Sequence, residues 1–189
     1  MPEQTVLTTE RLVLRPHRID DAPVMASLLE SGDITARLEY LIWPYDTGIA
    51  DQWLEGLPAR REPGAVYFAA TLRETGDPRQ AGDYIGDIGL SSVDTGSARA
   101  ELGYWFGKPY WGRGYGTEAA RAVIDYGFNV LGLNRIWATH FHTNPASGRV
   151  MQKIGMTHEG SMRRHVKKNG EYVDFEVYGI LREEYQAQD

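Results

Sequence analysis

The sequence predicts a mixed α/β protein in which helices cover both faces of a central, mostly antiparallel sheet. Short apolar runs of period two, separated by turns rich in Gly, Asp and Pro, fill residues 65–106. A strand–helix–strand–helix order follows, and Asn169-Gly170 then marks a tight hairpin turn. The alternating part favours parallel pairing and the hairpins favour antiparallel pairing, so one mixed sheet accommodates both.

The first part of the chain is expected to form one strand and two helices. Residues 11–15 are apolar and are bounded by Pro16, which is typical of a strand. Asp20 or Asp21 can cap a helix that ends near Gly32. A second helix is expected over residues 49–57, where apolar side chains recur at helical spacing.

Three strands are expected next, over residues 66–72, 84–93 and 98–106. The segment 74–83 between the first two is rich in Gly, Asp and Pro, which indicates a hairpin loop. A second turn is expected at Asp94-Thr95-Gly96-Ser97.

The remainder of the chain alternates between helices and strands. A helix from about Thr117 to Gly132 carries a continuous apolar stripe, and a strand over 134–141 follows. Asn144-Pro145 suits the start of the next helix, which Gly155 ends. A short strand at 156–159 and a hairpin of 162–167 with 172–180 complete the expected sheet.

The composition limits the kinds of partner. The 189 residues suit one domain over 1–189. A net charge of −6 argues against general affinity for nucleic acid or an anionic membrane surface. The sequence contains no cysteine, which excludes disulfides, thiolate metal ligands and a cysteinyl intermediate. With a polar start and no apolar run of ~20 residues, a cytoplasmic location is expected.

A glycine-rich stretch before the central helix predicts an anion site. Gly112, Gly114 and Gly116 alternate with larger residues, and glycine lets a ligand approach the main chain closely. The first amides of the following helix are unpaired and lie at the positive end of its dipole, and Arg113 can add charge. The P-loop pattern is absent and the dinucleotide pattern Gly-x-Gly-x-x-Gly fits poorly. A dinucleotide cradle and a turn without any ligand remain alternatives.

Several motifs in order resemble the GNAT superfamily of acetyl-CoA-dependent N-acetyltransferases, and within it the branch of ribosomal-protein N-terminal alanine and serine acetyltransferases. The resemblance runs nearly end to end. The motifs that carry it are Thr9-Glu10-Arg11-Leu12-Val13-Leu14-Arg15-Pro16, Ile85-Gly86-Asp87-Ile88-Gly89-Leu90, Ala100-Glu101-Leu102-Gly103-Tyr104-Trp105-Phe106, Tyr110-Trp111-Gly112-Arg113-Gly114-Tyr115-Gly116-Thr117-Glu118-Ala119 and Asn144-Pro145-Ala146-Ser147.

The resemblance implies a single GNAT-like domain that binds acetyl-CoA as co-substrate and needs no metal. Its phosphate loop is usually written Gln/Arg-x-x-Gly-x-Gly/Ala. Gly114 and Gly116 match this pattern, whereas Trp111 stands in the Gln/Arg position. The cofactor-binding residues implied are Phe106, Gly107, Trp111, Gly112, Arg113, Gly114, Tyr115, Gly116, Thr117 and Asn144.

The implied reaction is direct attack of an amine on the thioester in a ternary complex. An α-amine has a pKa near ~8 and a lysine amine near ~10.4, so a base must take a proton. Glu101, on the strand before the loop, is the expected base; the alternative is a carboxylate in a salt bridge. Ser147 is the expected acid near the sulfur, with a simple helix first-turn hydroxyl as the alternative. Asn144 is expected to bond the pantetheine arm and also to cap its helix.

The acceptor is expected to be a peptide N-terminus or a small-molecule amine. Tyr40, Trp43 and Tyr45 lie in the region that covers the acceptor site in this superfamily, although a packing cluster explains them equally well. The basic run over 163–168 is interpreted as a solvated hairpin rather than an RNA site. His140 and His142 lack a third ligand, so a metal is not expected. A non-catalytic acyl-CoA-binding module is the alternative function, and both a monomer and a homodimer are compatible with the sequence.

Overall fold

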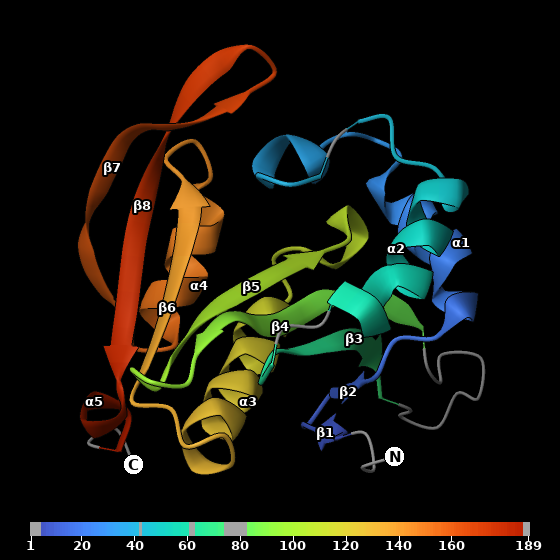
Figure 1. The fold of residues 1–189 in the computed structure, drawn as a ribbon. Helices are drawn as coiled ribbons and strands as arrows, with labels where there is room; N and C mark the ends of the chain where they lie inside the picture. Colours follow the sequence, from blue (N-terminus) through green and yellow to red (C-terminus); the bar gives the residue numbers. More distant parts are fainter. Residues whose placement is uncertain (1–4, 42, 61–62, 74–82, 187–189) are drawn as a thin grey trace.

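A computed structural model describes residues 5–41, 43–60, 63–73 and 83–186, and it shows a single eight-stranded sheet covered by helices (Figure 1). The strands are β1 (Leu7–Thr8), β2 (Leu12–Arg15), β3 (Val66–Leu72), β4 (Tyr84–Asp94), β5 (Arg99–Phe106), β6 (Arg135–Phe141), β7 (Thr157–Lys168) and β8 (Glu171–Leu181). The α-helices are α1 (Ala22–Leu29), α2 (Thr47–Arg60), α3 (Tyr115–Asn129), α4 (Pro145–Lys153) and α5 (Arg182–Gln186). The 3₁₀-helices are η1 (Ile19–Asp21), η2 (Thr35–Arg37) and η3 (Lys108–Tyr110).

The strand order is β1-β2-β3-β4-β5-β6-β8-β7, which confirms the predicted mixed and mostly antiparallel sheet. Every neighbouring pair is antiparallel except β5 with β6. That single parallel pair is joined through α3, as expected because a parallel connection needs a crossover.

Helices lie on both faces of the sheet, as predicted (Figure 1). On β3, Phe68 and Ala70 belong to the core cluster that contains the buried face of α3 and Met151 of α4. Ala69, between them, belongs to a second cluster with the buried residues of α1 and α2. The period-two alternation of the strand therefore supplies both cores. Within the described ranges, no helix is long and apolar enough to cross a membrane.

Two element boundaries differ from the expectation in ways that matter for the site. Helix α3 begins at Tyr115 rather than near Thr117, because Gly114 takes a left-handed conformation and the helix starts immediately after it. The expected short strand and the first hairpin strand form one continuous β7, whose register with β8 shifts between Met162 and Val166. The predicted turn is present, with positive φ at Asn169 and Gly170. Most of the predicted loop over 74–83 lies outside the described residues.

Candidate active site

The sheet opens between its two parallel strands. Pairs between β5 and β6 end at Glu101 with Trp137, although β5 continues to Phe106 and β6 to Phe141. Beyond that pair, β5 and β6 do not pair with each other, so their facing N–H and C=O groups need other hydrogen-bond partners. A cavity of about 560 Å³ occupies this region and extends to the glycine-rich loop after β5.

The loop presents backbone donors to this cavity. Gly112 and Gly114 have φ of 74° and 86°, conformations that glycine adopts without strain. The first bond of α3 joins the Glu118 amide to the Gly114 carbonyl, so the amides of Tyr115, Gly116 and Thr117 precede the helical ladder. These three residues line the cavity, and a Cβ added at Gly112 would meet nothing within 4 Å. The helix dipole adds positive potential here, so the loop suits a phosphate.

The N-terminal segment braces the start of α3. The Glu118 carboxylate accepts hydrogen bonds from the Thr9 hydroxyl at 2.6 Å, from the Arg11 amide at 2.8 Å and from Arg11 Nε at 2.7 Å. Burial alone would raise the pKa of Glu118, but these bonds lower it below its ordinary value. Thr9 and Arg11, although far from the glycine-rich loop in sequence, therefore help to hold the start of α3 in place.

Two residues of the predicted cofactor set do not line the cavity. Arg113 is exposed, and its carbonyl accepts a bond from Arg11 Nη1 at 2.9 Å. Gly107 is instead a close-packing position, because a Cβ there would lie 2.6 Å from Leu28 Cδ2. Phe106, Trp111 and Asn144 do line the cavity with the glycine loop.

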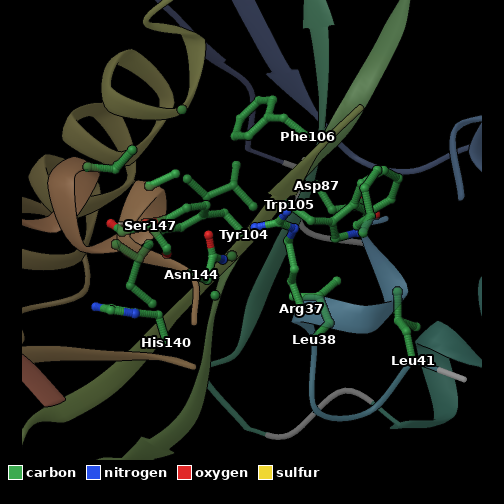
Figure 2. Close-up of a pocket in the computed structure, with 18 of the residues that line it drawn as sticks. Arg37, Leu38, Leu41, Asp87, Tyr104, Trp105, Phe106, His140, Asn144 and Ser147 are labelled. Carbon is green, nitrogen blue, oxygen red and sulfur yellow. Dashed lines mark hydrogen bonds between the residues drawn. The ribbon is translucent and has the colours of Figure 1, made fainter. Parts of the chain in front are cut away.

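A hydroxyl pair joins β5 to α4. Tyr104 Oη lies 2.9 Å from Ser147 Oγ and 3.1 Å from the Ser147 carbonyl. Burial raises the pKa of Tyr104 to about 12, while its bond with Ser147 opposes the shift. Asn144 is the N-cap residue of α4, but its side chain makes no capping bond and lines the cavity instead (Figure 2). The sequence indicated Ser147 and Asn144, whereas Tyr104 was missed because a strand tyrosine carries no positional signal.

Glu101 lies at the point where the strands part. It is the last residue of β5 paired with β6, lines the cavity and accepts a bond from the Ser92 hydroxyl at 3.4 Å. Gly103, two residues further on the same strand face, pairs with Gly89 of β4. A Cβ added at Gly103 would meet nothing within 4 Å. The sheet therefore offers a glycine floor at Gly103, beside Glu101, whereas Gly89 is closely packed, because a Cβ there would lie 2.4 Å from the Val66 carbonyl oxygen.

The floor ends at a polar cluster that the sequence did not predict. Asp87, which pairs with Trp105 on β5, contacts His17 Nε2 and accepts a bond from Tyr84 Oη at 2.7 Å. The His17 ring lies edge-on to Trp53 of α2, with 5.2 Å between ring centroids. Of these side chains, His17, Trp53, Asp87 and Trp105 line the cavity. Contacts between the segment before η1, helix α2 and strands β4 and β5 bring them together, so no local motif reveals them.

The three predicted acceptor aromatics separate in the structure. Tyr45 is buried and lines the cavity, with its hydroxyl 3.5 Å from Met25 Sδ, and burial raises its pKa to about 12. Tyr40 is 86% exposed and lies on the cavity rim. Trp43 lies elsewhere: its indole donates to the Glu30 carbonyl at 3.0 Å and faces a separate recess near Gly32.

The two histidines and the basic run lie in different surroundings. His140 is buried and lines the cavity, whereas His142 is exposed and contacts Glu176 at 2.7 Å. The described residues hold no group of three or more His, Cys, Asp or Glu side chains suited to a metal ion. In the basic run, Lys168 turns inward and donates to the carbonyls of Leu38 and Leu41, with the Leu38 bond at 2.7 Å.

The chain is similar to known acetyltransferases over most of its length. The family model described as "Acetyltransferase (GNAT) domain" matches residues 11–157. The N-acetyltransferase p20 of Bacillus licheniformis is 32% identical over 181 residues, covering 95% of this chain and 97% of that protein. YdaF of Bacillus subtilis, by name a candidate ribosomal N-acetyltransferase, is 35% identical over 107 residues, or 57% of this chain and 58% of YdaF. A solved GNAT-family acetyltransferase from Bacillus anthracis has a TM-score of 0.80 at 27% identity, covering 95% of this chain and 99% of that one.

Proposed function

This chain belongs to the GNAT acetyltransferase family and is an acetyl-CoA-dependent N-acetyltransferase, and from that premise we propose how its cavity performs the transfer. One observation carries the proposal: β5 leaves β6 at Glu101, and the opening runs directly into the glycine loop. The amides from Gly112 to Thr117 would hold the pyrophosphate of acetyl-CoA, and Asn144 would bond its pantetheine arm. Acetyl-CoA supplies an activated thioester.

Glu101 is proposed as the general base. The acceptor must reach the thioester as a neutral amine, and an ammonium with a pKa of ~8 to ~10.4 has to lose a proton first. Glu101 lines the cavity beside the glycine floor, where an amine can approach without meeting side chains on the strand. The ammonium proton passes to the Glu101 carboxylate, and the neutral amine nitrogen then forms its bond to the acetyl carbon.

The donor for the oxyanion and the acid for the leaving sulfur lie on β5 and α4. The developing oxyanion needs a preorganised donor, and a backbone N–H of β5 beyond Glu101, no longer paired with β6, can supply one. As the carbon–sulfur bond breaks, Ser147 Oγ–H gives its proton to the sulfur. Tyr104, whose raised pKa keeps it a neutral phenol, holds Ser147 Oγ in position through their 2.9 Å contact. A thiol pKa near ~8.5 means that this help need only be modest.

The proposed acceptor is a protein N-terminal α-amine or a small primary amine, with Tyr40 and Tyr45 on the acceptor side. Similarity to YdaF, a candidate ribosomal N-acetyltransferase by name, supports the first of these. Trp43 is left out of the proposed site because it faces another recess.

Incubation with acetyl-CoA and a panel of N-terminal peptides, polyamines and other small amines tests the proposal. Amine-dependent release of free CoA, with a matching gain of one acetyl mass on the acceptor, is the expected result. Binding of acetyl-CoA without turnover on any acceptor would instead favour a non-catalytic acyl-CoA-binding module. A larger thermal shift with NAD than with CoA would favour a dinucleotide site, since stabilisation grows with ligand concentration relative to Kd.

A further inference from the structure

We propose that Arg37 binds the pyrophosphate of acetyl-CoA and supplies the cationic side chain that the phosphate loop lacks at Trp111. The inference rests on the proposed function only in assigning CoA to the cavity. Arg37 belongs to η2, far from the loop in sequence, and no phosphate-binding motif includes it. It nevertheless lines the same cavity as Gly112, Gly114 and Gly116.

The guanidinium of Arg37 is held over the loop. Its Cζ lies 5.4 Å from the centroid of the Trp111 ring, which is a cation–π distance. Arg37 Nε donates to the Asp33 carbonyl at 3.1 Å, and this bond ties the base of the guanidinium to the backbone just before η2. In Figure 2 the side chain extends from η2 into the cavity, toward Tyr104 and Trp105. The terminal nitrogens make no hydrogen bond to any residue that the structure describes, so they are available to a ligand.

Trp111 provides a platform for this charge rather than a ligand of its own. Its indole Nε1 donates to the Phe106 carbonyl at 2.6 Å, which uses the only donor of the side chain. A fixed indole face orients a guanidinium, whose planar fork matches phosphate oxygens bidentately. Trp111 and Arg37 together thus replace the single Gln or Arg of the usual loop pattern.

Arg113, the loop arginine, is a weaker candidate for the same role. It is exposed, does not line the cavity, and lies on the side where Arg11 reaches its carbonyl. The sequence places Arg113 inside the motif, but the left-handed glycines on either side of it turn that position out of the cavity.

Two contacts tie the segment that carries Arg37 to the rest of the site. Lys108, at the start of the loop, forms an ion pair with Asp33 at 2.7 Å. Lys168, at the tip of the β7–β8 hairpin, donates to the carbonyls of Leu38 and Leu41. Arg37 lies between these anchors, so its place over the loop is part of the fold.

Calorimetric measurement of Kd for CoA, dephospho-CoA and pantetheine tests the assignment in Arg37→Gln. The variant is expected to bind CoA and dephospho-CoA more weakly by on the order of 10- to 100-fold, the effect of losing hydrogen bonds to a charged group. Pantetheine has no pyrophosphate, so its Kd should change less than twofold. Arg37→Lys should recover part of the loss, and Arg163→Gln, an exposed arginine on β7, should match the wild type.

Three results would overturn the assignment. Unchanged CoA affinity would remove Arg37 from the site. An equal loss for pantetheine would show that Arg37 acts on the arm or on the fold. A loss for CoA that disappears with dephospho-CoA would assign Arg37 to the 3′-phosphate. Because all arms measure binding, a chain that binds CoA but transfers no acetyl group would refute the proposed function without refuting this inference.

Discussion

The hydroxyl groups of Tyr104 and Ser147 lie 2.9 Å apart and connect β5, the strand before the glycine-rich loop, to helix α4. Because burial raises the pKa of Tyr104 to about 12, its phenol stays protonated well above neutral pH. The contact also fixes the position of Ser147 relative to β5. A hydroxyl in the first turn of a helix without such a contact would not be fixed in this way.

Ser147→Ala should lower kcat about 100-fold, at the low end of the range for general acid catalysis because the thiol leaves readily. Tyr104→Phe should have a smaller effect, since Ser147 keeps its own hydroxyl. Steady-state kinetics with acetyl-CoA measure both. Tyr172→Phe, at a tyrosine that is 58% exposed, is the control. A wild-type kcat in Ser147→Ala would remove the serine from the reaction.

Glu101→Gln should reduce kcat/KM for the amine by about 10²- to 10³-fold while the Kd of acetyl-CoA stays constant. The deficit should narrow above pH ~8 for an α-amine acceptor, because free amine then accumulates without a base. A pH–rate profile of both proteins measures this. Glu171→Gln, exposed at the hairpin, is the matched control. A deficit of the same size at every pH would argue against a role in proton removal.

Glu118→Gln should destabilise the protein and weaken acetyl-CoA binding, because the brace at the start of α3 is lost. Lost bonds to a charged group cost about 1–3 kcal/mol, and a chain of this size shifts its Tm by about 2–4 °C per kcal/mol. Since the folded-state pKa is lowered, the contribution is fully present above pH ~4.5 and lost as pH falls through the folded-state pKa.

Thermal unfolding of Glu118→Gln between pH 7 and pH 3 tests whether the stabilisation by Glu118 is lost as the pH falls. The difference in Tm from the wild type should shrink on acidification, and a difference that grows would contradict it. Glu10→Gln, an exposed neighbour of the same segment, should unfold like the wild type throughout.

Gly103→Val should raise KM for the acceptor at least tenfold while Tm stays within about 1 °C. The added atoms enter space in which a Cβ meets nothing within 4 Å, so the fold tolerates them and the bound amine does not. Gly132→Ala is the control outside the cavity. A Cβ there also meets nothing within 4 Å, but the backbone φ of 73° should lower the free energy of unfolding by about 1 kcal/mol. An unchanged KM in Gly103→Val would place the acceptor elsewhere.

Lys168→Met should free the segment over residues 38–41, because the Nζ bonds to its carbonyls are lost. Hydrogen exchange of that segment should become faster, and KM for the acceptor should rise several-fold. Lys167→Met removes the neighbouring exposed charge, which lies 5.9 Å from the Tyr172 ring centroid, and should leave exchange at 38–41 unchanged. Equal effects of both variants would indicate a change in charge rather than a lost anchor.

Much of the fold was predictable because its signals are local. Alternating apolar residues indicated β3, β4 and β5, and Asn169-Gly170 indicated the last hairpin. The two-residue strand β1 was not predicted, because so short a run carries no periodicity. The start of α3 was misplaced by two residues, since the spacing of three glycines does not say which of them ends the loop.

The site divides in the same way. The glycine loop, Asn144 and Ser147 belong to contiguous motifs and were found together in one cavity. Arg37, Tyr104 and the His17–Asp87 pair reach that cavity through contacts between distant elements, which no sequence spacing reports. Conversely, Trp43 and Arg113 belong to suggestive stretches, but backbone geometry turns them away from the cavity.

A crystal structure with acetyl-CoA tests the central claim most directly. The claim predicts pyrophosphate oxygens within hydrogen-bond distance of the amides between Gly112 and Thr117, with the thioester in the opening between β5 and β6 near Glu101 and Ser147. A cofactor bound outside this opening, or one whose thioester lies away from both side chains, would contradict it.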